Sequence, residues 1–203
     1  MAKVGEKSII EHQLDFVEQM VPDALVHVVI GYKWEEVREH LLRRNVHTIL
    51  NPFWDCSGIN GSAWLSLPYI KSQDVWRIDG DVIFTEPITL VSNRTVFFAN
   101  NCPNPRETAY LNIAGGDVTS LGLVDDYKGP HEWSCSEIYR HGDYRTVVSG
   151  GPHLVKMGHY FEAVNHAIDI GWLKWPGYRL VTGVYEIDTR EDLDNARKQL
   201  SDG

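Results

Sequence analysis

Two short acidic segments carry the residue types that could do chemistry in this chain. Asp79-Gly80-Asp81 follows the hydrophobic run Val75–Ile78, and Glu186-Ile187-Asp188 follows the apolar run Tyr178–Tyr185. In an open α/β sheet, ligands bind beyond the carboxyl ends of the strands. Carboxylates at that edge suit a hard cation such as Mg²⁺, which takes oxygen ligands and shares them with phosphates. The two segments therefore predict one divalent-cation site assembled from distant parts of the sequence.

Each acidic segment also has a purely structural interpretation. Asp-Gly-Asp after a strand is typical of a turn, because both residue types favour turn conformations. Asp188-Thr189 before a polar helical stretch is typical of a helix N-cap. Either segment alone favours the structural interpretation, and only their combination favours a metal site.

Composition excludes several classes of protein. The 203 residues carry 28 acids and 19 bases, for a net charge of −9, which argues against a nucleic-acid polymer as partner. A single nucleotide is still compatible, since a bound cation can neutralise its phosphates. The three cysteines are too few and too scattered for a disulfide framework or a zinc motif. No apolar run reaches the ~18 residues that span a bilayer, and no apolar segment near Met1 resembles a secretion signal, so we expect no membrane insertion and a cytoplasmic location.

The first half of the sequence alternates helix and strand patterns. Ser8 and Glu11 form a capping-box pattern before a helix that runs to Val21. The expected strands are Leu25–Ile30, His47–Leu50 and Val75–Ile78, and the expected helices between them lie around Trp34–Leu41 and Ser62–Tyr69. This alternation predicts parallel strands in this half.

The second half reads mainly as strands joined by turns. The expected strands are Thr95–Ala99, Thr108–Ile113, Val118–Val124, Ser134–Tyr139 and Tyr178–Tyr185, with a hairpin turn at Gly115-Gly116-Asp117. A helical stripe runs from Met157 to Ile168, and Thr189 is the expected N-cap of a last helix. No repeat or linker interrupts the sequence, which predicts one domain over residues 1–203.

Five segments together resemble a known family. They are GEKSIIEHQL at 5–14, VIGYK at 29–33, Asn51-Pro52, IDGDVIF at 78–84 and YEIDTREDLDNA at 185–196. In this order they resemble the nucleotidyltransferases with a GT-A-like fold, especially the branch of choline-phosphate cytidylyltransferases and sugar-phosphate nucleotidyltransferases. The resemblance implies an α/β, single-domain, three-layer fold with a mixed, mostly parallel central sheet.

The resemblance also assigns roles to residues. It implies that Asp81 and Asp188 are catalytic residues that hold Mg²⁺, with Glu186 either as a third ligand or as the residue that orients a water. It implies a nucleotide site formed by Asp79 and Gly80 together with Asn60, Gly61 and Ser62. Asp79 would either reach the ribose or cap its own turn, and an ordinary turn and a Ser62 N-cap fit the last three residues equally well. In this family, a phosphorylated acceptor attacks the α-phosphorus of a nucleoside triphosphate and releases pyrophosphate. CTP is the favoured donor.

Aromatic residues of the second half are candidates for the acceptor pocket. Aromatic faces attract quaternary ammonium groups such as choline by cation–π interaction. The acceptor candidates are Glu132, Trp133, Tyr160 and Trp172. A phosphorylated sugar is equally compatible, and a core role is the competing interpretation of the aromatic rings.

One family element has no match in the sequence. The family places a strand, a G-x-G-x-R loop and a Pro-Lys pair upstream of the segment that resembles Met1-Ala2-Lys3-Val4, and there the loop cradles the triphosphate. We therefore expect weak or absent transferase activity from residues 1–203. Two alternatives stay open: a glycosyltransferase, since Asp79-Gly80-Asp81 matches its D-x-D pattern, and a non-catalytic nucleotide-binding relative. A homo-oligomer is compatible with each of them.

Overall fold

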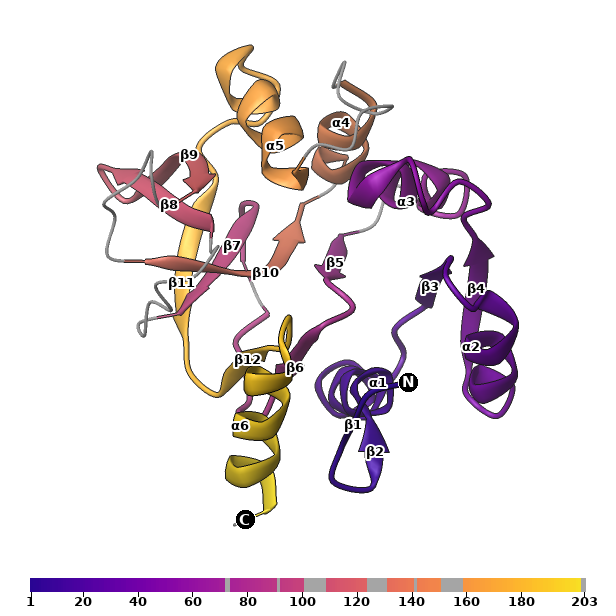
Figure 1. Ribbon diagram of the computed structural model, residues 1–203. Helices are drawn as coiled ribbons and strands as arrows, with labels where there is room; N and C mark the ends of the chain where they lie inside the picture. Colours follow the sequence, from indigo (N-terminus) through magenta and orange to yellow (C-terminus); the bar gives the residue numbers. More distant parts are fainter. Residues whose placement is uncertain are drawn as a thin grey trace.

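The computed structural model describes residues 1–71, 74–90, 92–100, 109–123, 131–140, 142–150 and 159–201. Helices lie on both sides of the strands, with α3, α4 and α5 grouped on one side and α1 and α6 on the other (Figure 1). Among the described residues, no helix combines the length and apolar character needed to cross a bilayer.

The chain begins with a small hairpin and a capped helix. β1 (Lys3–Val4) pairs antiparallel with β2 (Lys7–Ser8), and α1 (Ile9–Met20) follows directly. The Glu11 carboxylate accepts hydrogen bonds from both the Ser8 N–H and the Ser8 hydroxyl, each at 2.7 Å. This contact satisfies a free N–H at the helix start, and the predicted capping box is confirmed.

A two-stranded parallel sheet comes next. β3 (Val26–Ile30) pairs with β4 (Val46–Leu50) from Val26↔Val46 to Ile30↔Leu50, and α2 (Trp34–Leu41) connects them. The parallel arrangement predicted for this half is confirmed here. α3 (Gly58–Ser66) begins four residues before the predicted start at Ser62, so Ser62 is not an N-cap.

A six-stranded sheet forms the centre of the molecule. Its strands are β5 (Val75–Ile78), β7 (Val96–Asn100), β8 (Ala109–Ala114), β9 (Asp117–Leu123), β10 (Glu132–Tyr139) and β11 (Gly177–Val181). The order is β11-β7-β10-β8-β9, and β5 pairs with the second half of β10. The predicted hairpin at Gly115-Gly116 is confirmed: it joins β8 to β9, and both glycines have positive φ.

The directions of the strands make this sheet mixed. β5, β7 and β8 each pair antiparallel with β10, whereas β11 pairs parallel with β7. These four strands therefore share one direction, and β9 and β10 run the opposite way. The predicted α/β fold with a mixed central sheet is confirmed, although most neighbouring strands within this sheet pair antiparallel, because β10 lies between strands of the other direction.

The strand expected over 178–185 is divided in two. β11 ends at Val181, and β12 (Val184–Glu186) leaves the central sheet to pair with β6 (Val82–Phe84). Gly183 between them has φ +64°, and its backbone approaches Thr85 so closely that a Cβ atom would lie 2.5 Å from the Thr85 hydroxyl. Only glycine meets both conditions without strain, and this break directs β12 toward β6.

The remaining helices close the two sides of the sheet. α5 (Tyr160–Asp169) and α6 (Arg190–Ser201) agree with the predicted helices, although Met157 lies outside the described residues. The Thr189 hydroxyl accepts a hydrogen bond from the Asp192 N–H, as expected of an N-cap. α4 (Asp143–Gly150) was not predicted, because Thr146, Val147 and Val148 are β-branched and Gly150 disfavours helices.

Candidate metal and nucleotide site

Backbone pairing brings the two acidic segments together. β6 begins directly after Asp81, and β12 ends at Glu186, which lies opposite Val82. The pairing extends by one more bond, because the Ile187 N–H donates to the Asp81 carbonyl at 3.0 Å. Asp81 and Asp188 therefore come from adjacent backbones, as the cation-site prediction requires.

The side chain of Asp81 is partly buried and incompletely partnered. Burial raises the pKa of this carboxyl group, and the nearby Asp79 raises it further, whereas a hydrogen bond with the Asp188 side chain lowers it. The Asp81 Oδ1 atom is buried without a hydrogen-bond partner. Two carboxylates within hydrogen-bond reach of each other repel unless a proton or a cation lies between them. The Asp81–Asp188 pair is therefore suited to a cation.

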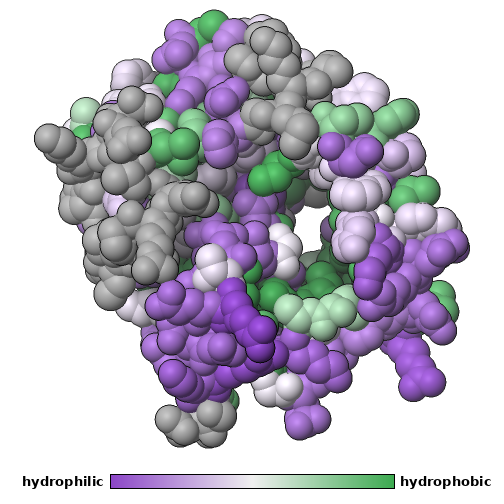
Figure 2. Space-filling model, in the orientation of Figure 1, coloured by the Kyte–Doolittle hydropathy of each residue, from purple (hydrophilic) through white to green (hydrophobic). Residues whose placement is uncertain are grey.

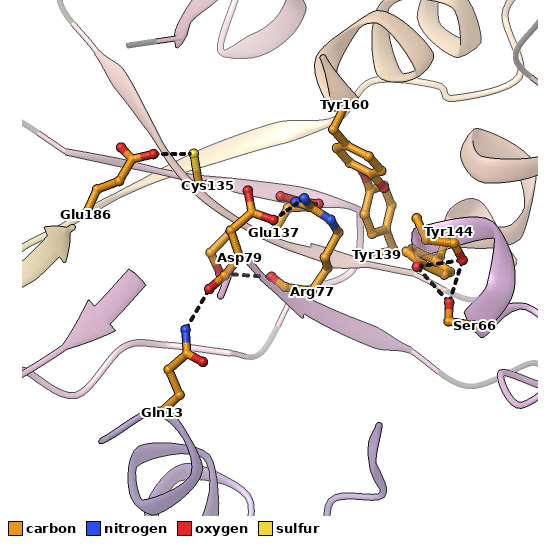
Figure 3. Close-up of polar contacts among 12 residues, drawn as sticks. Gln13, Ser66, Arg77, Asp79, Cys135, Glu137, Tyr139, Tyr144, Tyr160 and Glu186 are labelled. Carbon is orange, nitrogen blue, oxygen red and sulfur yellow. Dashed lines mark hydrogen bonds and ion pairs between the residues drawn. The ribbon is translucent and has the colours of Figure 1, made fainter. Parts of the chain in front are cut away.

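Glu186 is the third acid of the cluster. Burial raises its pKa to about 7, and the charges of Asp188 and Asp81 act in the same direction. A Glu186 carboxylate oxygen accepts a hydrogen bond from the Cys135 thiol at 3.0 Å (Figure 3). Glu186 thus lies within electrostatic reach of both aspartates but faces Cys135.

The donor set fits a cation that is shared with a ligand. Within the described residues, no group of three or more His, Cys, Asp or Glu side chains is arranged to hold a metal ion. Mg²⁺, however, is commonly held by one or two carboxylates, with waters and substrate phosphates completing its octahedron. Asp81 and Asp188 with the unpartnered Asp81 Oδ1 match that pattern. The role of Glu186 as a third ligand remains a prediction.

The turn that carries Asp79 and Asp81 is fixed from two sides. The Gln13 side chain on α1 donates to the carbonyls of Asp79 at 2.6 Å and of Val82 at 2.7 Å. The Asp79 N–H donates to the Cys135 carbonyl at 3.1 Å. The space around Gly80 is open, since a Cβ atom there would have no neighbour within 4 Å. The turn is therefore held by its flanks and accessible at Gly80.

Asp79 points into the molecule toward a buried ionic network. Arg77 donates to Asp79 through Nη2 and to the Glu137 carboxylate through Nη1, the second bond being 2.9 Å long (Figure 3). Glu137 is fully buried, its second oxygen has no partner, and burial raises its pKa to about 7. Because Asp79 is engaged in this way, a contact from its carboxylate to a ribose would require the Arg77 pair to open.

Cys135 sits where β10 is irregular. The register between β10 and β7 shifts between Trp133 and Glu137, and Cys135 has φ +49°, in the left-handed region. Such bulges redirect side chains and often occur next to functional sites. Here the bulge turns the Cys135 thiol toward Glu186, and burial raises the pKa of the thiol well above its usual value. Nothing in the sequence indicated this residue.

The three residues predicted near the base lie in the first turns of α3. The Asn51 amide donates to the hydroxyls of Ser57 and Ser62, each at 3.0 Å, and so ties the loop after β4 to this helix. Asn60 is buried, and its amide lies 3.5 Å from the His159 carbonyl. A Cβ atom on Gly61 would lie 2.3 Å from the Ser57 side chain. These residues stabilise the loop, and their contact with a nucleotide remains a prediction.

The four acceptor candidates separate into a buried group and an exposed residue. Trp133 and Tyr160 are core residues whose rings stack with centroids 6.4 Å apart, and Glu132 is also buried. The Arg77 guanidinium lies 3.8 Å from the centre of the Tyr160 ring, so an acceptor cation cannot stack on that face. Trp172 is 54% exposed and packs against Gly150. The structure therefore does not gather the four residues into one open aromatic box.

Comparisons with known proteins define the class of fold. Neither a protein-family model nor a curated protein sequence matches the chain. Solved structures do: the CTP:phosphocholine cytidylyltransferase from Streptococcus pneumoniae is similar with a TM-score of 0.75 at 18% identity, over 98% of this chain and 87% of that protein. A Bacillus anthracis protein assigned as a glucose-1-phosphate thymidylyltransferase is similar with a TM-score of 0.81 at 15% identity, over 99% of this chain and 85% of that protein.

A third similar structure is the inositol-1-phosphate CTP transferase from T. maritima, with a TM-score of 0.73 at 14% identity over 99% of this chain and 88% of that protein. The chain therefore has the fold of the nucleotidyltransferases. At these identities, the likeness establishes the fold and leaves the substrates to the proposal below.

Proposed function

We propose that this chain is an Mg²⁺-dependent nucleotidyltransferase that takes its nucleotidyl group from a nucleoside triphosphate, with CTP as the favoured donor. The acceptor is a phosphorylated small molecule such as choline phosphate or a sugar phosphate. The observation that carries the proposal is the meeting of Asp81 and Asp188 at the β6–β12 pairing, inside a nucleotidyltransferase fold.

The reaction places modest demands on the protein. An oxygen of the acceptor phosphate forms a bond to the α-phosphorus as the bond to the bridging oxygen breaks, and pyrophosphate leaves. The acceptor oxygen is already anionic, so no general base is needed, and catalysis rests on positioning and charge stabilisation. Mg²⁺ held by Asp81 and Asp188 would supply Lewis acidity and a template for the phosphate oxygens.

The surrounding residues support this chemistry by fixing the two aspartates. Gln13 holds the turn that carries Asp81, and the pairing of β12 with β6 holds Asp188 beside it. Open space at Gly80 leaves the backbone of the turn accessible to a ligand. Arg77 neutralises Asp79 and Glu137 behind the site, which limits the negative charge that faces an incoming triphosphate.

A specific observation disfavours the glycosyltransferase alternative. In the D-x-D pattern, both aspartates serve the metal-bound diphosphate, whereas Asp79 is here paired with Arg77 and directed into the core. A nucleotide-binding protein without catalysis remains the second candidate. It is favoured because the sequence contains no match to the G-x-G-x-R loop that cradles the triphosphate in the resembled family.

Isothermal titration calorimetry with CTP, in the presence and absence of Mg²⁺, tests the proposal on the chain as it stands. We expect Mg²⁺-dependent binding that Asp81→Asn and Asp188→Asn each weaken by about tenfold or more, the effect of removing a charge-assisted ligand. Asp194→Asn is the matched control, because Asp194 is exposed on α6 and pairs with Arg197. Equal CTP binding by all four proteins would refute the proposal.

Pyrophosphate release separates the two candidate functions. With choline phosphate or glucose 1-phosphate as acceptor and CTP or UTP as donor, we expect weak or absent release from residues 1–203. Weak but detectable Mg²⁺-dependent release in any donor and acceptor combination would support the transferase, whereas metal-dependent binding without any release in every combination would favour the non-catalytic candidate. Robust release by these residues alone would overturn the expectation of weak activity.

A further inference from the structure

Two histidines lie side by side on the small parallel sheet of β3 and β4. The register of this sheet places His27 directly opposite His47. Because side chains alternate between the faces of a strand, residues paired in this way project from the same face of the sheet. The centroids of the two imidazole rings are 5.4 Å apart, and their planes make an angle of 69°. The two rings are therefore immediate neighbours.

A third ring packs against this pair. Tyr69 follows α3, and the centre of its ring lies 5.9 Å from that of His27 and 4.8 Å from that of His47. Contact with Tyr69 restricts the rotamers of both imidazoles, so the entropy cost of ordering them is met when the chain folds. A ligand that binds both rings thus meets a pair that is already positioned, which favours affinity.

One ring nitrogen of the pair lacks a partner. The Nδ1 atom of His27 is buried and makes no hydrogen bond. Buried polar atoms are rarely left unpaired in proteins, so this nitrogen calls for an explanation. Burial, reinforced by the nearby His47, lowers the pKa of His27, so its ring is neutral at pH 7. Neutral imidazole is the form of histidine that binds metal ions.

The spacing of the rings suits a shared transition-metal ion. A bond from Zn²⁺ to a histidine nitrogen is about 2.0–2.1 Å long, so two nitrogens that share the ion are at most about 4 Å apart. Rings with centroids 5.4 Å apart can present two nitrogens at that separation, because each nitrogen lies on the rim of its ring. Within the described residues, no group of three His, Cys, Asp or Glu side chains is arranged to hold a metal, so waters would complete the coordination.

We propose that His27 and His47 form a second metal site, which binds a transition-metal dication of the Zn²⁺, Ni²⁺ and Cu²⁺ class through one nitrogen of each ring. Ions of this class favour imidazole, whereas Mg²⁺ favours oxygen ligands. The site belongs to the β3–β4 sheet and is separate from the β6–β12 pairing that carries Asp81 and Asp188. A bound ion would tie β3 to β4 through side chains as well as backbone.

The surroundings of the pair are accessible and attract cations. His47 is exposed, whereas His27 is partly buried. The surface over α2 and β4, at the right of Figure 2, is mostly hydrophilic. The chain carries a net charge of −9, and the connecting helix α2 adds the exposed acids Glu35, Glu36 and Glu39. A field of this sign raises the local concentration of cations. A hydrated dication can therefore reach His47 from solvent and exchange two waters for the two nitrogens.

Electron paramagnetic resonance of Cu²⁺, added to the full untagged chain without nucleotide, tests the site independently of the proposed function. Nitrogen ligands split the Cu²⁺ signal, so the number of bound imidazoles can be counted. We expect a two-nitrogen pattern in the wild type. His27→Phe and His47→Phe keep a ring beside Tyr69 but remove the nitrogens, and each should weaken binding about tenfold or more and leave at most one nitrogen. The control His159→Asn, at an exposed histidine before α5, should retain the two-nitrogen pattern.

Two further measurements separate this site from the acidic pair and from effects on folding. Asp81→Asn should leave the two-nitrogen pattern unchanged, because Asp81 lies in another sheet. Nuclear magnetic resonance of the wild type needs no variant: Cu²⁺ below one equivalent should broaden the signals of His27 and His47 before those of Asp81 and Asp188. This second measurement decides the question even where a phenylalanine variant does not fold.

Three outcomes would overturn the histidine site. The first is a wild-type spectrum without two nitrogen ligands, and the second is binding that is unchanged by His27→Phe or by His47→Phe, since each ring must supply one nitrogen. The third is broadening that begins at residues other than His27 and His47, which would place the ion elsewhere on the chain.

Discussion

The replacement Glu137→Gln offers a quantitative test of the buried network behind the candidate site. Glu137 is fully buried on β10, one of its oxygens accepts from Arg77 at 2.9 Å, and the other has no partner. Burial, reinforced by the charge of Asp79, raises the pKa of Glu137 from 4.5 to about 7, even though Arg77 opposes the shift. The folded protein therefore retains a proton that the unfolded chain releases.

The sign and size of the effect follow from this pKa. A raised folded-state pKa adds stability below pH 4.5 that is lost as the pH rises through about 7. The pKa difference of about 2.5, at about 1.4 kcal/mol for each pH unit, gives a loss of about 3 kcal/mol. Glutamine has the same shape and does not titrate, so the variant should lack this loss.

Urea unfolding of both proteins at several pH values between about 4.5 and 8 measures the effect. The free energy of unfolding of Glu137→Gln minus that of the wild type should rise by about 3 kcal/mol across this range. Glu18→Gln is the control, because the Glu18 side chain is 76% exposed. A difference that stays constant with pH would refute the buried, protonated Glu137.

Two further substitutions test how the turn and the network are held. Arg77→Met removes the cation that pairs with Asp79 and Glu137 and should cost about 3–5 kcal/mol in urea unfolding at pH 8, where both carboxylates are ionised in the wild type and lose their counter-charge. A loss below about 1 kcal/mol would contradict this network. Gln13→Ala leaves the carbonyls of Asp79 and Val82 without their donor and should cost about 2 kcal/mol. Gln13→Ala should also weaken Mn²⁺ binding. The control Gln199→Ala, on the exposed face of α6, should change neither the free energy of unfolding nor the Mn²⁺ affinity. Equal Mn²⁺ affinity of the two variants would contradict a positioning role for Gln13.

Local sequence patterns predicted much of the fold because helix caps, hairpin turns and short strands depend on residues that are close together in the sequence. The strand Val75–Ile78 was predicted with its observed bounds, since a short β-branched run ends there at Asp79-Gly80. The capping box of α1 and the hairpin at Gly115-Gly116 depend on contacts within a few residues. α4 was missed because its β-branched residues favour strands when tertiary packing is unknown.

The candidate site was only partly predictable because some of its side-chain contacts depend on the register between strands that are far apart in the sequence. The meeting of Asp81 and Asp188 follows from strand ends and was expected from the sequence. The Arg77–Glu137 pair depends on the alignment of β5 with β10, in which Glu137 lies opposite Arg77, and no local pattern specifies that register. Tyr160 was interpreted as an acceptor residue, yet its ring face is covered by Arg77. An arginine and a glutamate within buried strands were the signals that could have indicated the pair.

Mn²⁺ binding followed by electron paramagnetic resonance tests the metal pair most directly, since Mn²⁺ accepts the oxygen ligands that Mg²⁺ uses. We expect one bound Mn²⁺ per chain, which Asp81→Asn and Asp188→Asn each remove and which Asp194→Asn retains, because Asp194 pairs with Arg197 on the surface of α6. Binding that survives both of the first two substitutions, or that is absent from the wild type even with CTP present, would contradict a cation shared by Asp81 and Asp188.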